Sequence, residues 1–140
     1  MTLIVDAGGL LSVFDGDQDD HELFLEAVQA ASGPLVVSPI VLAELDHFIL
    51  DRLGRRREIA ALEEIEEAYE VERFTGEDLA RARALLSRYA DLTTFDLADA
   101  SCVVLAERHD CFDILTTDQR DFRAVTGRDG QYFRILPHDS

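Results

Sequence analysis

The 140 residues, 47% of them hydrophobic, suit one domain over residues 1–140 with a buried core, whereas a net charge of −16 disfavours broad attraction to nucleic acid. All 13 basic residues are arginine, which excludes phosphate sites that normally use lysine, such as the P-loop. No apolar run approaches the roughly 20 residues of a membrane span, and no basic signal-peptide region precedes the apolar start, so we expect a cytoplasmic protein with no membrane partner.

The first half of the chain alternates β-branched runs with helical hydrophobic patterns. Ser38 and Pro39 supply an N-cap and a first-turn proline, which indicates where one helix begins. Gly54 marks the end of that helix, ahead of the basic run of residues 55–57. The predicted elements are a strand over Leu3–Val5, a helix of about ten residues from His21, a strand over Leu35–Val37, and helices over Ile40–Leu53 and Glu58–Ala68.

The second half continues this alternation. Thr75 and Asp78 form a capping-box pattern, which predicts that a helix starts there. The predicted elements are a strand around Tyr69–Glu72, helices from Thr75 to about Tyr89 and over Leu97–His109, and strands over Ile114–Thr116 and Tyr132–Leu136. Strands that alternate with helices imply an α/β fold with a central, mostly parallel sheet, in which ligands bind at the carboxyl ends of the strands.

Two carboxylates lie on helix faces that are otherwise apolar. Glu44 falls on the same face as Val41 and Phe48, about one turn from each. Asp99 likewise shares a face with Cys102. Removing an isolated carboxylate from water is costly, so a group in this position is generally paired, protonated or bound to a metal.

Asp6 and Asp118 each follow a predicted strand, so both belong at the carboxyl edge of the sheet. Glu44 and Asp99 lie near the starts of helices that enter from that edge, so four acids can converge there. Because the chain has no lysine to balance them, we expect this cluster to bind Mg²⁺ or Mn²⁺, ions that prefer oxygen ligands. Such ions activate water and stabilise the leaving oxygen, which predicts hydrolysis of phosphodiesters.

Each of these acids also has a structural explanation. Asp6 can cap the helix that follows it, Asp118 can shape a turn, and Glu44 can sit at the edge of its stripe with its carboxylate in solvent. Asp96 stands where an N-cap belongs, three residues before Asp99, so its own role is expected to be structural. Asp99 can be a first-turn acid favoured by the helix dipole, although this explanation ignores its apolar neighbours.

Four segments resemble, in order, the VapC-type PIN domain. They are VDAGGLL (5–11), SPIVLAELDHFI (38–49), LADASCVVLAER (97–108) and ILTTDQRDF (114–122). The resemblance implies a PIN-like, Rossmann-like α/β/α sandwich with an Mg²⁺- or Mn²⁺-dependent endoribonuclease site. Carried over, the acids that are both catalytic and metal-binding fall on Asp6, Glu44, Asp99 and Asp118. Asp6 and Asp99 are then the first candidates for direct ligands, and Asp96 is an auxiliary acid.

The same resemblance implies the toxin of a toxin–antitoxin pair, which cleaves a structured RNA such as a tRNA or ribosomal RNA and so inhibits translation. Its partner is then a VapB-like antitoxin, whose C-terminal segment wraps across the toxin groove, and toxins of this kind commonly form homodimers. The residues themselves support only part of this, because an acidic cleft suits a partner's arginine and apolar helix faces suit a groove.

Two arginine clusters are candidates for contact with RNA phosphates: residues 55–57, and Arg120 with Arg123. A basic run at the end of a helix is, however, also typical of a solvated terminus matched to the helix dipole. Thr116 and Thr117 can orient a water or phosphate through their hydroxyls, or can simply favour the strand.

Three other functions fit parts of the pattern. A nuclease of the same fold that acts on DNA usually carries extra acids and larger insertions. A non-catalytic binding module, whose acidic pocket holds a basic partner segment, predicts no metal-dependent cleavage. A phosphatase with Asp6 as its nucleophile is disfavoured by the missing lysine and by the lack of a second acid two residues after Asp6.

Overall fold

Five short strands form the sheet at the centre of the molecule. The strands are β1 (Leu3–Val5), β2 (Leu35–Val37), β3 (Glu70–Val71), β4 (Asp113–Leu115) and β5 (Arg134–Leu136). They come from a computed structural model, which describes residues 1–139. Neighbouring strands are all parallel, in the order β3-β2-β1-β4-β5. Strands β1, β2 and β4 are buried along their whole length, as the continuous apolar runs of a parallel sheet require.

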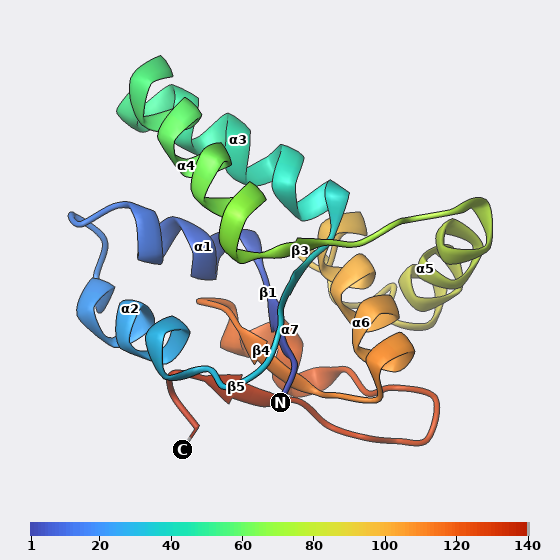
Figure 1. The fold of residues 1–140 in the computed structure, drawn as a ribbon. Coiled ribbons are helices and arrows are strands. Elements are labelled where there is room, and N and C mark those ends of the chain that lie inside the picture. Colours follow the sequence, from blue (N-terminus) through green and yellow to red (C-terminus); the bar gives the residue numbers. More distant parts are fainter. Residues whose placement is uncertain (140) are drawn as a thin grey trace.

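Helices cover both faces of the sheet, so the predicted α/β/α arrangement is confirmed. They are α1 (Ala7–Phe14), α2 (His21–Ala30), α3 (Pro39–Leu53), α4 (Arg55–Ala68), α5 (Gly76–Arg88), α6 (Leu97–His109) and α7 (Gln119–Ala124). Figure 1 shows α1 and α2 on one side of the sheet, α5 and α6 on the other, and α3 and α4 side by side, extending away from it. Within residues 1–139, none of the helices is long and apolar enough to cross a membrane.

The order of the strands creates a switch point between β1 and β4. After β1 the chain moves outward through β2 to β3, and then returns to place β4 and β5 on the other side of β1. At such a point the connections leave the sheet in opposite directions, which opens a crevice at the carboxyl ends of the two strands. Asp6 directly follows β1, and Thr116 directly follows β4, so both lie at this crevice.

Most of the predicted elements are confirmed, including the starts of α3 and α5. The Ser38 hydroxyl accepts hydrogen bonds from the N–H groups of Ile40 at 3.1 Å and Val41 at 3.3 Å, and Thr75 forms a capping box with Asp78. The strand predicted to begin at Tyr132 is shorter, because the residues before β5 contribute only an isolated antiparallel bridge between Thr126 and Tyr132. The predictions for β3 and β4 are each off by one residue at both ends.

One predicted helix start is wrong, and one helix was missed. The fourth helix begins at Arg55, not at Glu58, because Gly54 adopts φ 86° and turns the chain directly into the new helix. Arg55 then donates to Glu58 at 2.7 Å, an i,i+3 pair that stabilises this first turn. The short helix α7 was not predicted at all, since its six residues are too few for a hydrophobic period to be visible.

Candidate metal centre

Asp6 stands at the end of β1, where it contacts two other elements. Its Oδ2 accepts a hydrogen bond from the Thr116 hydroxyl at 2.8 Å, and Cys102 Sγ in α6 lies 4.0 Å from its Oδ1. Although Asp6 occupies the N-cap position of α1, its side chain makes no capping hydrogen bond within residues 1–139, so the capping explanation is wrong. The carboxylate is only 5% exposed and points into the crevice between the strands.

Asp118 lies across the crevice from Asp6 and is joined to it through one side chain. Its backbone N–H donates to Thr116 Oγ1 at 3.0 Å, while the Thr116 hydroxyl donates to Asp6. Its own Oδ1 caps α7 by accepting from the Asp121 N–H at 3.1 Å. Thr116 is therefore more than a strand former, because its hydroxyl fixes the positions of two acids.

Asp96 and Asp99 begin α6 with a reciprocal capping box. Asp96 Oδ1 accepts from the Asp99 N–H at 3.0 Å, and Asp99 Oδ2 accepts from the Asp96 N–H at 3.0 Å. The predicted N-cap role of Asp96 is thus confirmed. The box also holds the Asp99 carboxylate, which is 8% exposed, at the same edge of the sheet as Asp6.

Glu44 approaches the same place from α3. It is half-buried, and burial together with the negative charges of Asp96 and Asp6 raises the pKa of its carboxyl group. Because the charges of Asp96 and Asp6 act on Glu44, Glu44 lies near the edge of the sheet where the sequence placed it with the other acids. The carboxylate keeps partial access to solvent, which leaves it reachable by a substrate.

One acid of this region was missed in the sequence. Asp121, in the first turn of α7, is buried, and one oxygen each of Asp99, Asp118 and Asp121 lie within 4.8 Å of one another. In the sequence, Asp121 is visible only as an acid three residues after Asp118. This spacing indicates a role in the site only when α7 is known to begin at Gln119. We refer to all six acids as the acidic cluster: Asp6, Glu44, Asp96, Asp99, Asp118 and Asp121.

Among the described residues, no positive side chain pairs with the acidic cluster. In residues 1–139, every ion pair made by an arginine or histidine is with an acid outside the cluster. Burial, and to a lesser degree the charges of Asp118 and Asp96, raises the pKa of Asp6 to about 6. Burial and the charge of Asp6 raise the pKa of Asp99 to about 9. The ionised form of these carboxylates is therefore unfavourable in the folded protein unless a cation binds among them.

The donors in the cluster fit Mg²⁺ or Mn²⁺. All of them are carboxylate oxygens, which these ions prefer, and the free cysteine nearest to Asp6 is a buried thiol whose pKa burial raises well above its usual value. One oxygen, Asp121 Oδ1, is buried without a hydrogen-bond partner among the described residues. A set of oxygen ligands with an unpartnered member and no cationic side chain suits a divalent ion of this class.

The raised pKa values predict how the metal-free protein responds to pH. Because the folded-state pKa of Asp6 is about 6 against an ordinary 3.8, its contribution to stability falls as the pH rises between these values. Asp99 extends the loss up to about pH 9. We expect the melting temperature in EDTA to fall as the pH rises from 3.8 to about 9, with both groups contributing below about pH 6 and Asp99 alone above it. Mg²⁺ should reduce this fall, and a melting temperature that is independent of pH in EDTA would contradict the electrostatic description.

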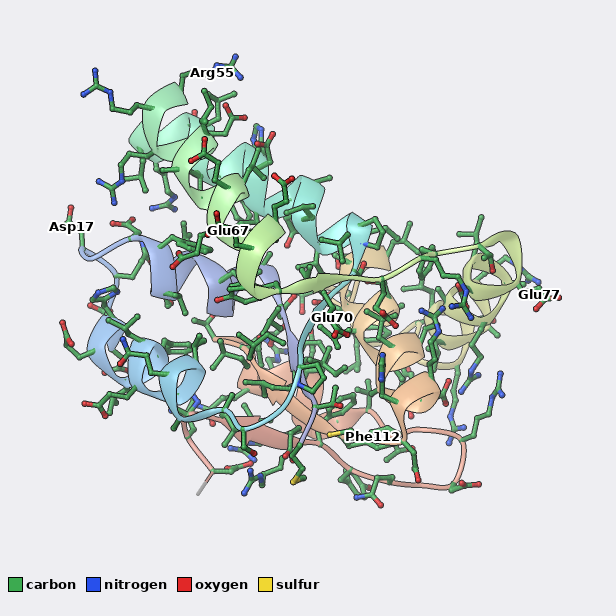
Figure 2. The ribbon with its side chains drawn as sticks, in the orientation of Figure 1. Asp17, Arg55, Glu67, Glu70, Glu77 and Phe112 are labelled. Carbon is green, nitrogen blue, oxygen red and sulfur yellow. The ribbon has the colours of Figure 1, made fainter. Side chains whose placement is uncertain are left out.

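The basic run of residues 55–57 lies away from the acids. Figure 2 shows Arg55 at the outer tip formed by α3 and α4, and Arg57 donates to the Phe14 carbonyl at 3.1 Å. The expected alternative, a terminus matched to the helix dipole, is wrong, because these residues begin α4, where the dipole favours negative charge. Arg123 pairs with Asp139 at 2.8 Å. Contact of either cluster with RNA stays a prediction.

Comparisons with known proteins identify the family of this chain. Residues 3–128 match the PIN domain family. The chain is 35% identical over 136 residues to ribonuclease VapC26 of Mycobacterium tuberculosis, an alignment that covers 96% of this chain and 100% of that protein.

Solved structures resemble the fold. VapC20 of Mycobacterium tuberculosis, described as a toxin that cleaves the sarcin-ricin loop, superimposes with a TM-score of 0.77 at 18% identity, covering 84% of this chain and 91% of that one. VapBC2 of Rickettsia felis, solved with a DNA fragment from its promoter, gives 0.71 at 14% identity and covers 96% and 98%. FitAcB of Neisseria gonorrhoeae gives 0.66 at 18% identity, with coverage of 94% and 96%. The chain therefore belongs to the PIN domain family and is a homologue of the VapC ribonuclease toxins.

Proposed function

We propose that this chain is a metal-dependent endoribonuclease, the toxin of a VapBC-type pair, whose acidic cluster binds Mg²⁺ or Mn²⁺. The observation that carries the proposal is the convergence of Asp6, Glu44, Asp99 and Asp118 at the switch point without a cationic side chain among them. The relationship to ribonuclease VapC26 supports RNA as the substrate.

The residues of the cluster have different roles in the proposed hydrolysis. A divalent cation bound here supplies electrostatic stabilisation to a phosphodiester under attack and to its leaving oxygen. Asp6 and Asp99 are the direct ligands in this proposal, and Thr116 and the capping box with Asp96 orient their carboxylates. Glu44 remains partly accessible and has a raised pKa, which suits a group that takes up a proton at its carboxylate during cleavage.

The substrate class that we propose is structured RNA, either a tRNA or ribosomal RNA, and cleavage of it would inhibit translation in the cytoplasm. The similar fold of a toxin that cleaves the sarcin-ricin loop favours this class. A net charge of −16 disfavours long, nonspecific tracking along RNA, so recognition depends on shape and on local contacts.

The proposed partner is a VapB-like antitoxin, and the proposed state of the toxin is a homodimer. The similar folds in VapBC2 and FitAcB support the antitoxin. A carboxylate cluster without its own basic partner is also a favourable place for an arginine of the antitoxin, which would occupy the site in place of the metal and substrate.

The purified chain is expected to cut total bacterial RNA into discrete fragments with Mg²⁺ or Mn²⁺ and to leave it intact in EDTA. Cation binding is required because the ionised carboxylates alone repel a phosphodiester. Gel or sequencing analysis of the fragments would identify the RNA that is cut. Equal inactivity with and without metal would favour a non-catalytic binding module, and equal activity with and without metal would point to a different mechanism.

A further inference from the structure

Asp121 has a buried oxygen without a hydrogen-bond partner in the part of the chain that the structure describes. The residue is 1% exposed, and its Oδ2 accepts a short hydrogen bond from the Thr94 hydroxyl at 2.6 Å. Its Oδ1 is fully buried and has no hydrogen-bond partner within residues 1–139. Leaving a buried carboxylate oxygen in this state is unfavourable, so a group that binds it is expected.

The surroundings of Asp121 identify the class of that group. Its carboxylate lies with those of Asp99 and Asp118, one oxygen of each being within 4.8 Å of the others. Adjacent oxygens on one Mg²⁺ or Mn²⁺ are about 3 Å apart, so the three carboxylates need to close by no more than about 2 Å to share an ion. The Asp121 N–H donates to Asp118 Oδ1 at 3.1 Å, which holds the two residues in register.

We propose that Asp121 is a fifth functional acid of this site, whose Oδ1 binds a divalent cation together with Asp99 and Asp118. Thr94 is then a positioning residue, because its hydroxyl binds Oδ2 and leaves Oδ1 as the oxygen that is free for a cation. The assignment rests on the proposed function, since it concerns the same cation-binding site. It adds a ligand from α7. The resemblance of the sequence to the family did not assign this residue a role.

Titration of Mn²⁺ into the purified full chain tests the assignment, with calorimetry giving the affinity and thermal melting in EDTA giving the metal-free stability. Asp121→Asn keeps an oxygen for the Thr94 hydroxyl and places an amide N–H₂ where the free oxygen was. We expect this variant to bind Mn²⁺ at least about tenfold more weakly. Its metal-free melting temperature should be unchanged or higher, because the amide can donate to the neighbouring carboxylates.

Thr94→Val is the matched control, since it removes the hydroxyl and leaves the Asp121 carboxylate in place. We expect it to weaken Mn²⁺ binding less than Asp121→Asn does. Wild-type affinity in Asp121→Asn would overturn the assignment. A loss of affinity together with a lower metal-free melting temperature would also overturn it, because Asp121 would then be a structural residue.

The outcomes for the wild-type chain separate this assignment from the proposed function. If the wild-type chain binds no Mn²⁺ and cuts no RNA, the metal-dependent ribonuclease itself is excluded. If the wild-type chain binds Mn²⁺ and cuts RNA while Asp121→Asn binds Mn²⁺ equally well, only the role of Asp121 is wrong.

Discussion

Replacing Asp99 with asparagine is expected to abolish RNA cleavage and, at the same time, to make the metal-free protein more stable. Asp99 is buried beside Asp6, and its pKa of about 9 means that its ionised form is disfavoured in the folded protein. Asparagine has nearly the same shape and can still accept the hydrogen bond from the Asp96 N–H. At neutral pH the folded protein holds Asp99 protonated although the unfolded chain ionises it, and asparagine removes the free-energy cost of this protonation without removing the helix cap.

The expected loss of activity is on the order of 10²–10³-fold, and the expected gain in metal-free stability is about 1–2 kcal/mol at neutral pH. Cleavage assays and thermal melting in EDTA measure the two effects. Asp113→Asn is the matched control, because Asp113 is also buried but lies at the other end of β4, where it pairs with Arg134 at 3.1 Å. It should lose stability and keep activity. A destabilised Asp99→Asn protein would contradict the repulsion that we describe.

Replacing Gly9 with alanine is expected to destabilise the protein by about 3 kcal/mol. Gly9 lies in α1, and a Cβ at this position would overlap the carbonyl oxygen of Leu115 in β4. A backbone atom in the middle of a sheet cannot rotate away, so α1 has to move. Because α1 directly follows Asp6, this movement also displaces the acidic cluster.

Urea unfolding of Gly9→Ala measures this effect, and Gly76→Ala is its control. Gly76 is also the first-turn residue of a helix, but nothing lies within 4 Å of the Cβ that it would gain, so alanine there should be neutral or slightly stabilising. Gly8→Ala should cost less than Gly9→Ala, because its Cβ meets only the Thr117 hydroxyl, which can rotate. Wild-type stability in Gly9→Ala would show that α1 does not pack this closely on β4.

Most of the fold could be predicted because its elements carry local signals. The strands over Leu3–Val5 and Leu35–Val37 are uninterrupted apolar runs, and the helix over Leu97–His109 begins with a capping box. The first turn of α4 was missed because the basic run of residues 55–57 carries no apolar period, and its pairing with Glu58 is visible only in three dimensions. Local patterns also carry no information about a helix as short as α7.

The acidic cluster could be predicted only in part, and from the fold class rather than from local sequence signals. Asp6 and Asp118 follow strands, and the carboxyl ends of parallel strands meet at one edge, so their convergence follows from the fold class. The roles of the neighbouring side chains do not follow from it. That Thr116 links the two acids, and that Asp121 lies among them with an unpartnered oxygen, depends on side-chain directions at the end of β4 and in α7.

The central claim is that the carboxylates at the switch point between β1 and β4 hold a catalytic cation. Locating Mn²⁺ by anomalous diffraction in crystals of the wild-type chain tests it most directly. We predict a peak among the carboxylates of Asp6, Asp99 and Asp118 that is absent from crystals of Asp99→Asn. No peak at this position under conditions in which the same protein cuts RNA, or a peak only at acids elsewhere on the surface, would contradict the claim.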